Sequence, residues 1–332
     1  MQPANHRLHL FSMLVVGATL GLIFAGGLVT TKDAGMSVPD WPTTFHYSMF
    51  AVPFEKWLGA EAMQSGVYYE HMHRLFASLV GMLTTALAVW IWIAESRLWL
   101  KWLGTVAFLL VAAQGVLGGL RVTHNSLTLA MIHGCVAQAF LCVLVIITAA
   151  LSTAWAKLAD SAPAAGMRGI SRTAWILVGA VYTQLIIGAV MRHMKAGLAI
   201  PTFPHSGLKG EWIPPFWNEG IALNFAHRIG ALVITLIVIT LLTLIFSKAG
   251  RERFLTWPAQ WLAVLVFTQI YLGSTVIMKM RPPTITTLHV LTGASILATS
   301  LLIALRVSRI SSAVDKKTVS SGLPQTMRGA TA

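Results

Sequence analysis

The chain has 332 residues, of which 56% are hydrophobic and 11% are charged, and its mean hydropathy is +0.71. A soluble domain carries about 25% charged residues, so this composition excludes a soluble enzyme and predicts a polytopic membrane protein. The net charge of +13 is typical of Lys and Arg gathered on cytoplasmic loops. Nucleic-acid binding is not expected, because no basic run is interleaved with aromatic residues.

Eight apolar segments approach the length of about 20 residues with which a helix crosses a bilayer. The first has the alternative of a signal peptide, but its apolar run is long and no small-x-small cleavage site follows it. The sequence therefore predicts an all-α membrane protein with eight transmembrane helices. They are expected at about 10–29, 72–94, 99–119, 128–150, 173–191, 222–246, 258–277 and 285–305.

The distribution of Lys and Arg predicts the orientation of these helices. The two termini and the short loops carry more of them than the remaining loops, which include two long ones at about 30–69 and 192–221. The positive-inside rule places both termini in the cytoplasm and the long loops outside. Because no Arg- and Ser-rich transit segment precedes the first helix, we expect a multi-pass protein in the lipid of a bacterial cytoplasmic (inner) membrane.

Four short patterns recur in the same order and at nearly one offset, which predicts two four-helix halves in the same orientation, a parallel repeat. We expect an amino-terminal half at 1–159, a cytoplasmic linker at 160–171, a carboxy-terminal half at 172–306 and a disordered cytoplasmic tail at 307–332. The recurring patterns are residues 34–42 and 196–204, His73-Arg74 and His227-Arg228, residues 114–118 and 269–273, and Ile132-His133 and Leu288-His289.

Each half carries a pair of histidines: His73 and His133 in the first, His227 and His289 in the second. One lies at the outer end of the second helix and the other about one turn into the fourth, so both have similar depth. Two imidazoles at one depth on neighbouring antiparallel helices are what bis-His haem ligation requires. A lone His near a helix end is more often interfacial, but two matched pairs favour a cofactor. Zinc fits less well, because no third or fourth ligand is apparent.

The other histidines have no matched partner in the repeat. His71 lies on another helix face than His73 and is expected at the membrane interface. We expect the remaining ones at the surface, in loops or at helix ends: His6, His9, His46, His124, His193 and His205.

The two halves differ one helical turn outside the first axial His. Glu70 shares a helix face with His73, whereas the second half has Asn224. A carboxylate beside a porphyrin edge can take a proton or stabilise a developing cation, which favours a reactive haem in the first half. The alternative is a surface ion pair of Glu70 with Arg74 at i,i+4. Arg74 and Arg228 are candidates to contact haem propionates, with interfacial snorkelling as the alternative.

This ordered set resembles the haem A synthase family over nearly all of residues 8–305. The resemblance implies an eight-helix membrane enzyme that oxidises a ring methyl of haem O to the formyl group of haem A, through hydroxylated intermediates, for haem-copper oxidases. The residues that carry it are Gly26-Gly27-Leu28-Val29-Thr30, Ala34-Gly35, Pro39-Asp40-Trp41-Pro42, Glu70-x-x-His73-Arg74, His133, His227-Arg228 and His289.

The resemblance also implies roles. His73 and His133 would flank the substrate haem O, Glu70 would serve the oxidation, and His227 and His289 would be the axial ligands of the iron of a haem b. Haem O would arrive through the membrane from a haem O synthase, and a separate electron acceptor is needed. Neither that acceptor nor the oxygen source is given by the sequence, and a homo-oligomer remains open.

The first long outer loop departs from the family. Some members carry a redox-active cysteine pair there, but residues 30–69 contain no Cys, so a thiol-dependent electron route is in doubt. The loop is instead rich in aromatic residues, which predicts a short interfacial helix over the substrate site; a plain amphipathic connector is the alternative. These aromatic residues are Phe50, Phe54, Trp57, Tyr68 and Tyr69.

Two other functions stay open on the sequence. A di-haem electron carrier of the membrane cytochrome b type would need haems toward both membrane sides, whereas all four histidines lie toward one. A transporter would suit the repeat and the intramembrane Gln114, Gln184 and Gln269. However, few embedded charges remain to couple ions, and the matched histidines would have no role.

Overall fold

The structure is a computed structural model that describes residues 5–160, 166–250 and 252–322. Within these residues, eight helices are long and apolar enough to cross a membrane, which confirms an all-α polytopic membrane protein. They are α1 (His6–Thr31), α4 (Val67–Ala94), α5 (Leu98–Thr123), α6 (Leu127–Leu151), α8 (Met167–His193), α9 (Glu219–Ala249), α10 (Arg253–Met278) and α11 (Pro283–Gly322).

The helices extend past their apolar runs, and polar side chains cap the first turn of three of them. The side chains of Asn5, Ser126 and Asn218 accept hydrogen bonds from the first turns of α1, α6 and α9. At its far end, the backbone of α11 is helical to Gly322, beyond residue 306, where the sequence predicts a disordered tail. Residues 323–332 of that tail and 161–165 of the expected linker lie outside the described residues, and α7 (Thr153–Asp160) precedes that gap.

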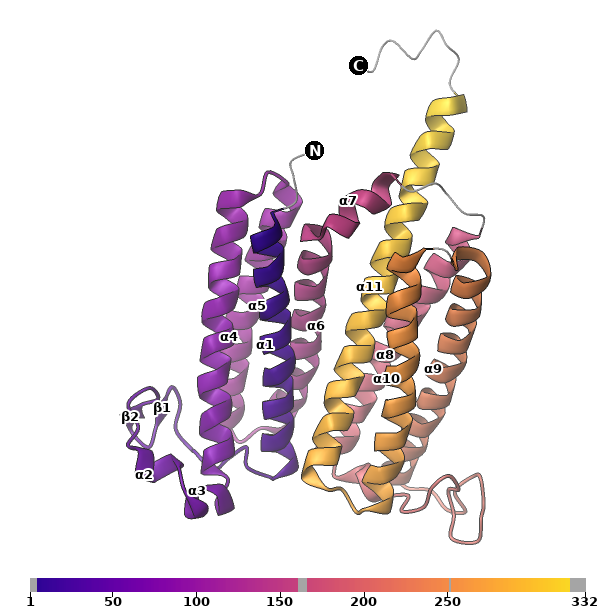
Figure 1. The fold of residues 1–332 in the computed structure, drawn as a ribbon. Helices are drawn as coiled ribbons and strands as arrows, with labels where there is room; N and C mark the ends of the chain where they lie inside the picture. Colours follow the sequence, from indigo (N-terminus) through magenta and orange to yellow (C-terminus); the bar gives the residue numbers. More distant parts are fainter. Residues whose placement is uncertain (1–4, 161–165, 251, 323–332) are drawn as a thin grey trace.

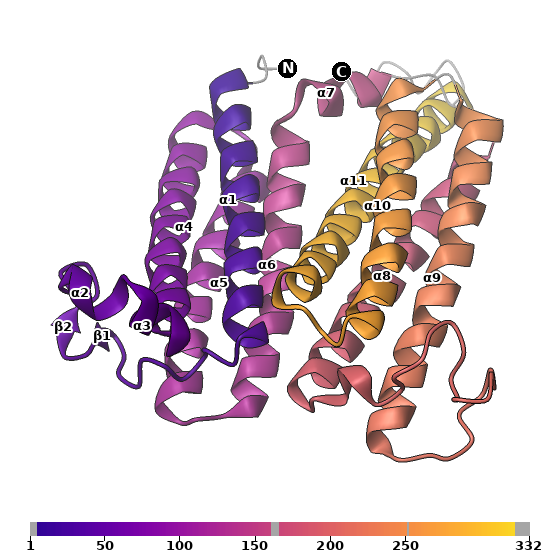
Figure 2. The same ribbon diagram turned by 60° about the horizontal axis from the view of Figure 1, so that its bottom comes forward.

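The long helices form two four-helix rings that stand side by side (Figures 1 and 2). Successive helices are neighbours around each ring, which closes by contacts of α1 with α6 and of α8 with α11. The second and fourth helices of each half therefore lie on opposite corners and run in the same direction. The expectation that they are neighbouring and antiparallel is wrong, because each helix packs against the next one in the chain, which leaves every second helix diagonal and parallel.

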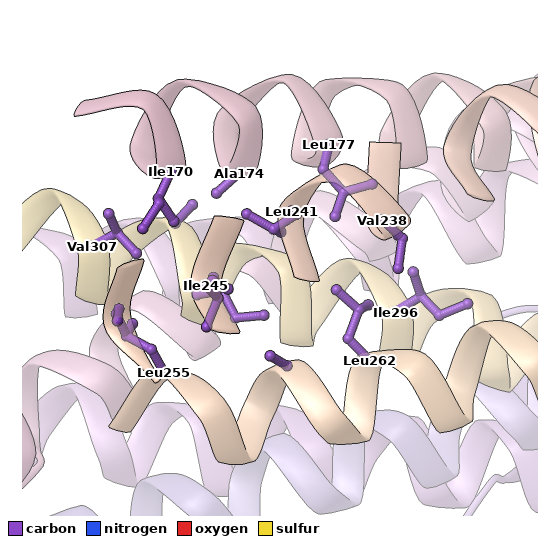
Figure 3. Packing of buried hydrophobic residues seen from close by; sticks show 14 of the residues in the cluster. Ile170, Ala174, Leu177, Val238, Leu241, Ile245, Leu255, Leu262, Ile296 and Val307 are labelled. Carbon is purple, nitrogen blue, oxygen red and sulfur yellow. The ribbon is translucent and has the colours of Figure 1, made fainter. Parts of the chain in front are cut away.

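Each ring has its own apolar core. In the second ring, side chains of α8, α9, α10 and α11 interdigitate, with Leu177, Leu241, Leu255 and Leu262 fully buried (Figure 3). A matching cluster fills the part of the first ring that lies toward the start of α1. These cores hold the helices together toward that end, and the histidines lie toward the opposite end, which carries the two long loops and is called the outer end below.

The two rings meet most closely where α1 passes α11 near the outer side. A Cβ added at Gly27 would lie 2.7 Å from the methyl carbon of Thr287, and the hydroxyl groups of Thr31 and Thr287 are 3.3 Å apart. Arg192 of α8 reaches across and donates to the carbonyl oxygen of Gly27 and the hydroxyl of Thr31. Gly27 thus allows the close approach of the halves.

The first long loop folds against the outer end of α4. It contains a two-stranded antiparallel hairpin, β1 (Thr43–Thr44) and β2 (Tyr47–Ser48), and two short helices, α2 (Phe54–Trp57) and α3 (Ala60–Gln64). The second long loop contains η1 (Ala196–Leu198). Both loops lie at the end of the molecule opposite the start of α1 and the end of α11 (Figure 1).

We expect Gly27→Val to weaken the packing of the two halves. The added side chain must displace Thr287, and overpacking of this kind costs about 1–3 kcal/mol. Gly17→Val is the matched control on the same helix, because a Cβ there meets nothing within 4 Å. Thermal unfolding in detergent should show a lower Tm for Gly27→Val than for Gly17→Val; equal values would contradict this account of the α1–α11 contact.

Candidate functional site

All four predicted haem-binding histidines pack against a glycine of the preceding long helix. Each imidazole is half-buried, and its Cε1 atom would contact a Cβ added at that glycine. A larger residue there would displace the ring, so the glycines fix where each imidazole lies. The pairs and distances are His73 with Gly26 at 3.0 Å, His133 with Gly118 at 3.3 Å, His227 with Gly188 at 3.2 Å and His289 with Gly273 at 3.0 Å.

In the second ring, His227 and His289 face each other across the diagonal. Their ring centroids are 6.3 Å apart and their planes meet at 59°. Two imidazoles that bind one metal from opposite sides, each through a nitrogen about 2 Å away, have centroids roughly 6 Å apart. The separation therefore fits an iron between the two rings.

Glutamines accompany three of the four imidazoles. Gln184 Nε2 lies 3.0 Å from His227 Nδ1 and donates to the carbonyl oxygen of His227 at 2.7 Å. Gln269 Nε2 lies 3.2 Å from His289 Nε2, and Gln114 donates to the carbonyl oxygen of His133 at 3.1 Å. Each glutamine precedes the packing glycine by one helical turn, whereas α1 has Leu22 at that position.

In the first ring, the Nδ1 atoms of His73 and His133 are buried and have no hydrogen-bond partner among the described residues. Such atoms are costly to leave unpaired, so this pair is suited to a ligand that engages its rings. No group of three or more His, Cys, Asp or Glu side chains able to hold a metal occurs in the described part of the chain. Axial ligation of an iron by the two imidazoles needs two donors only and stays a prediction.

Glu70 is almost fully buried, with 2% of its surface exposed. Its Oε1 atom accepts from Arg74 Nη2 at 2.9 Å, and its Oε2 atom accepts from the backbone amide of Val38 at 2.9 Å. The i,i+4 ion pair exists, but it lies inside the protein rather than at the surface. The carboxylate is thus held in one place beside the turn that carries His73.

In the second half, Asn224 binds the matching loop segment as a donor rather than as an acceptor. The Asn224 amide donates to the carbonyl oxygens of Ala196 and Gly197 at 3.0 and 3.1 Å. Its own oxygen accepts from Arg228 Nε at 3.0 Å. One half therefore buries an acceptor that is negative when ionised, and the other buries a neutral amide.

The guanidinium groups of Arg74 and Arg228 bind the outer loops. Both side chains donate to three backbone carbonyl oxygens, so these donors are engaged within the protein, and the propionate contact stays a prediction. The acceptors of Arg74 are Val38, Asp40 and Thr43, at 2.7, 2.7 and 3.0 Å; those of Arg228 are Ile200, Thr202 and His205, at 2.9, 2.7 and 3.1 Å.

Two residues differ from what the sequence suggested. His71, expected at the interface, is buried with 1% exposure, and its ring lies 4.9 Å from that of Trp57 in α2. Arg121, in the last turn of α5, was not singled out, yet its charge acts on Glu70, His73 and His133. The available signal was a charge at the end of one apolar segment, where the second half has Val276.

The amino-acid sequence matches a known protein family over most of its length. The family model COX15-CtaA, described as cytochrome oxidase assembly protein, matches residues 9–302. The chain belongs to this family.

Among curated relatives of the COX15-CtaA family, the heme A synthase of Halalkalibacterium halodurans is 25% identical over 314 residues, covering 92% of this chain and 98% of the relative. That of Symbiobacterium thermophilum is 30% identical over 258 residues, covering 75% and 78%. That of Shouchella clausii is 27% identical over 276 residues, covering 79% and 84%. The resemblance seen in the sequence is confirmed.

Asp40 organises the loop segment that Arg74 binds. Its carboxylate accepts from the Thr43 hydroxyl at 2.6 Å and from the amides of Phe45 and His46 at 2.8 and 2.9 Å. Burial acts to raise the pKa of this carboxyl, but the hydrogen bonds from Thr43, His46 and Phe45 outweigh it and lower the pKa to about 2. The hairpin thus has an ionised carboxylate at its centre at neutral pH.

We expect protonation of Asp40 to loosen this loop. A lowered pKa means that the stabilisation is present above the ordinary value of 3.8 and is lost as the pH falls toward about 2. Asp40→Asn should reproduce the loosened state at pH 7, seen as faster proteolysis between residues 40 and 48. Equal cleavage rates in Asp40→Asn and wild type at pH 7 would contradict this role.

Proposed function

We propose that the protein is a haem A synthase, which oxidises a ring methyl of haem O to the formyl group of haem A within the membrane. The observation that carries this proposal is the buried Glu70 one turn from His73, in only one of two otherwise similar histidine sites. Family membership and the heme A synthases among its relatives support it. The di-haem electron carrier is not favoured, because all four imidazoles lie toward one end of the helices.

The first ring is the proposed substrate site. Among the described residues no hydrogen bond reaches the ring nitrogens of His73 or His133, whereas one ring nitrogen of His227 and one of His289 lie beside a glutamine. His73 also lacks the neighbouring glutamine that the other three have. A substrate must enter and leave, so a less firmly held imidazole suits this half. Haem O reaches it from the membrane, supplied by a haem O synthase.

The second ring is the proposed site of a resident haem b. His227 and His289 have the separation that two axial ligands of one iron need. Gln184 lies beside Nδ1 of His227 and Gln269 beside Nε2 of His289, so each ring has its other nitrogen left for the iron. When bound, haem b supplies a one-electron redox centre. The chain's own contribution is to orient the two imidazoles and to surround the centre with apolar helices.

Glu70 is the proposed catalytic residue. Each oxidation of a methyl carbon releases protons and builds positive charge on that carbon, and a fixed carboxylate beside the ring can accept the proton or stabilise the charge. Arg74 and the amide of Val38 hold the carboxylate in place. The electrons pass to an acceptor outside the chain, and water is the proposed oxygen donor.

The proposed location is the bacterial cytoplasmic membrane, with both termini in the cytoplasm and the histidine sites toward the outer surface. The balance of Lys and Arg between the two sides supports this orientation. The proposal leaves room for a homo-oligomer.

We expect Glu70→Gln to retain haem at both sites while stopping the conversion at haem O or a hydroxylated form. The glutamine keeps the side-chain shape but cannot accept the proton, and loss of general-base catalysis lowers rates about 10²- to 10⁴-fold. Extracted haems are identified by mass. Glu61→Gln, which changes an exposed acid of α3 in the preceding loop, is the control and should make haem A normally. A normal haem A yield from Glu70→Gln would contradict a catalytic role of Glu70.

We also expect variants of the two histidine pairs to lose different haems, the resident haem b in one case and the substrate haem O in the other. His227→Ala and His289→Ala should purify without the low-spin haem b spectrum, because one axial ligand is missing. His73→Ala should keep that spectrum and lose haem O. His124→Ala, an exposed residue outside both pairs, is the control. Loss of haem b from His73→Ala with retention in His227→Ala would reverse the assignment.

A further inference from the structure

Arg121 lies at the outer end of the first four-helix ring. His73 and His133 occupy one diagonal of this ring, on α4 and α6. Arg121 starts from the last turn of α5, on the other diagonal, and its Nη2 atom donates to the carbonyl oxygen of Gly35 at 2.9 Å, just beyond the end of α1. The guanidinium group thus links the outer end of α5 to the segment after α1, close enough for its charge to act on His73 and His133.

Glycines make room for this position. A Cβ added at Gly35 would collide with the guanidinium of Arg121, and one added at Gly119 would collide with the ring of Trp41. The outer turn of α5 is therefore shaped so that the chain after α1 can lie close against it. The side chain of Arg121 is directed by this packing rather than free in solvent.

Most of the donors of Arg121 are available to a ligand. A guanidinium has five N–H donors, and the described residues engage Arg121 through one contact, the carbonyl oxygen of Gly35. Its charge acts on Glu70, His73 and His133, but the Glu70 carboxylate is already bound by Arg74 and Val38. His193, from α8, also lies within its electrostatic range. A half-buried cation with open donors near two imidazoles favours an anionic ligand.

We propose that Arg121 binds a propionate of the substrate haem and so fixes how the ring lies between His73 and His133. This inference rests on the proposed function. Arg74 and Arg228 each donate to three loop carbonyl oxygens, whereas Arg121 donates to one, so more of its donors are available to a propionate. A propionate bound by Arg121 determines which edge of the porphyrin, and hence which methyl group, faces Glu70. Arg121 is a positioning and specificity residue rather than the catalytic group.

The second half lacks this feature at the matched position, where Val276 stands. The arginine beside the matching Gly197 is Arg281, in the loop after α10, and only its aliphatic Cδ atom approaches, at 3.8 Å from a Cβ added at Gly197. An arginine at the outer end of the third long helix is therefore present only in the half that we propose for the substrate. Arg281 provides a matched control for the loss of one outer arginine.

The test uses the full-length protein with its resident haem and two probes, ferric protohaem and its dimethyl ester, which lacks both carboxylates. Titrations followed by absorbance give the affinity of each probe, and His73→Ala identifies the signal of the first site. We expect wild type to bind the acid about 10- to 100-fold more tightly than the ester, as a charge-assisted hydrogen bond allows. Arg121→Gln should bring this ratio close to one by weakening the acid alone.

Two further variants keep the test independent of folding defects. Arg121→Lys keeps the charge without the planar fork and should give an intermediate ratio. Gly35→Ala displaces only the flexible end of Arg121 and should also lower the ratio, whereas Arg281→Gln should leave it unchanged. An unchanged ratio in Arg121→Gln, or equal weakening of both probes, would overturn the inference. If neither probe gives a His73-dependent signal in wild type, the proposed substrate site itself is wrong.

Discussion

The buried guanidinium of Arg74 is the interaction on which the outer end of the first ring depends. It joins three carbonyl oxygens of the first long loop to the helix turn that carries His73, and it pairs with Glu70. A charge at this depth is costly unless every donor finds a partner, so loop, ion pair and helix must form together. Arg228 repeats the arrangement beside His227, which places charged residues near the membrane boundary in a structural role in both halves.

The function that we propose comes from what is not repeated. The first half has an acid where the second has Asn224, Arg121 where the second has Val276, and Leu22 where the second has Gln184. Each change has a physical consequence for the first half. The acid is a proton acceptor beside His73, Arg121 is a cation at the outer end of the four helices, and the His73 imidazole has no neighbouring amide. Together they suit a half that turns over a substrate, whereas the second half, with Asn224 in place of the acid and a glutamine beside each imidazole, suits a cofactor that stays.

Hydropathy and matched motifs predicted the eight helices and brought His73, His133, His227 and His289 into two pairs, because spanning length and helix register are local properties. The diagonal placement of each pair could not be predicted, since it depends on how successive helices close into a ring. His71 was misjudged because its burial comes from Trp57, in a loop whose two short helices carry little periodic signal. Arg121 escaped notice because a search for repeated residues cannot find one that occurs in a single half.

The most direct test of the account is the identity of the haems made when this chain is expressed together with a source of haem O. Haems extracted from the membranes are separated and identified by mass. The account predicts haem A, with hydroxylated haem O as an intermediate. The purified protein should also show a low-spin haem b that depends on His227 and His289. Haem O that stays unconverted, in a protein with two equivalent low-spin haems b, would contradict it and indicate an electron carrier.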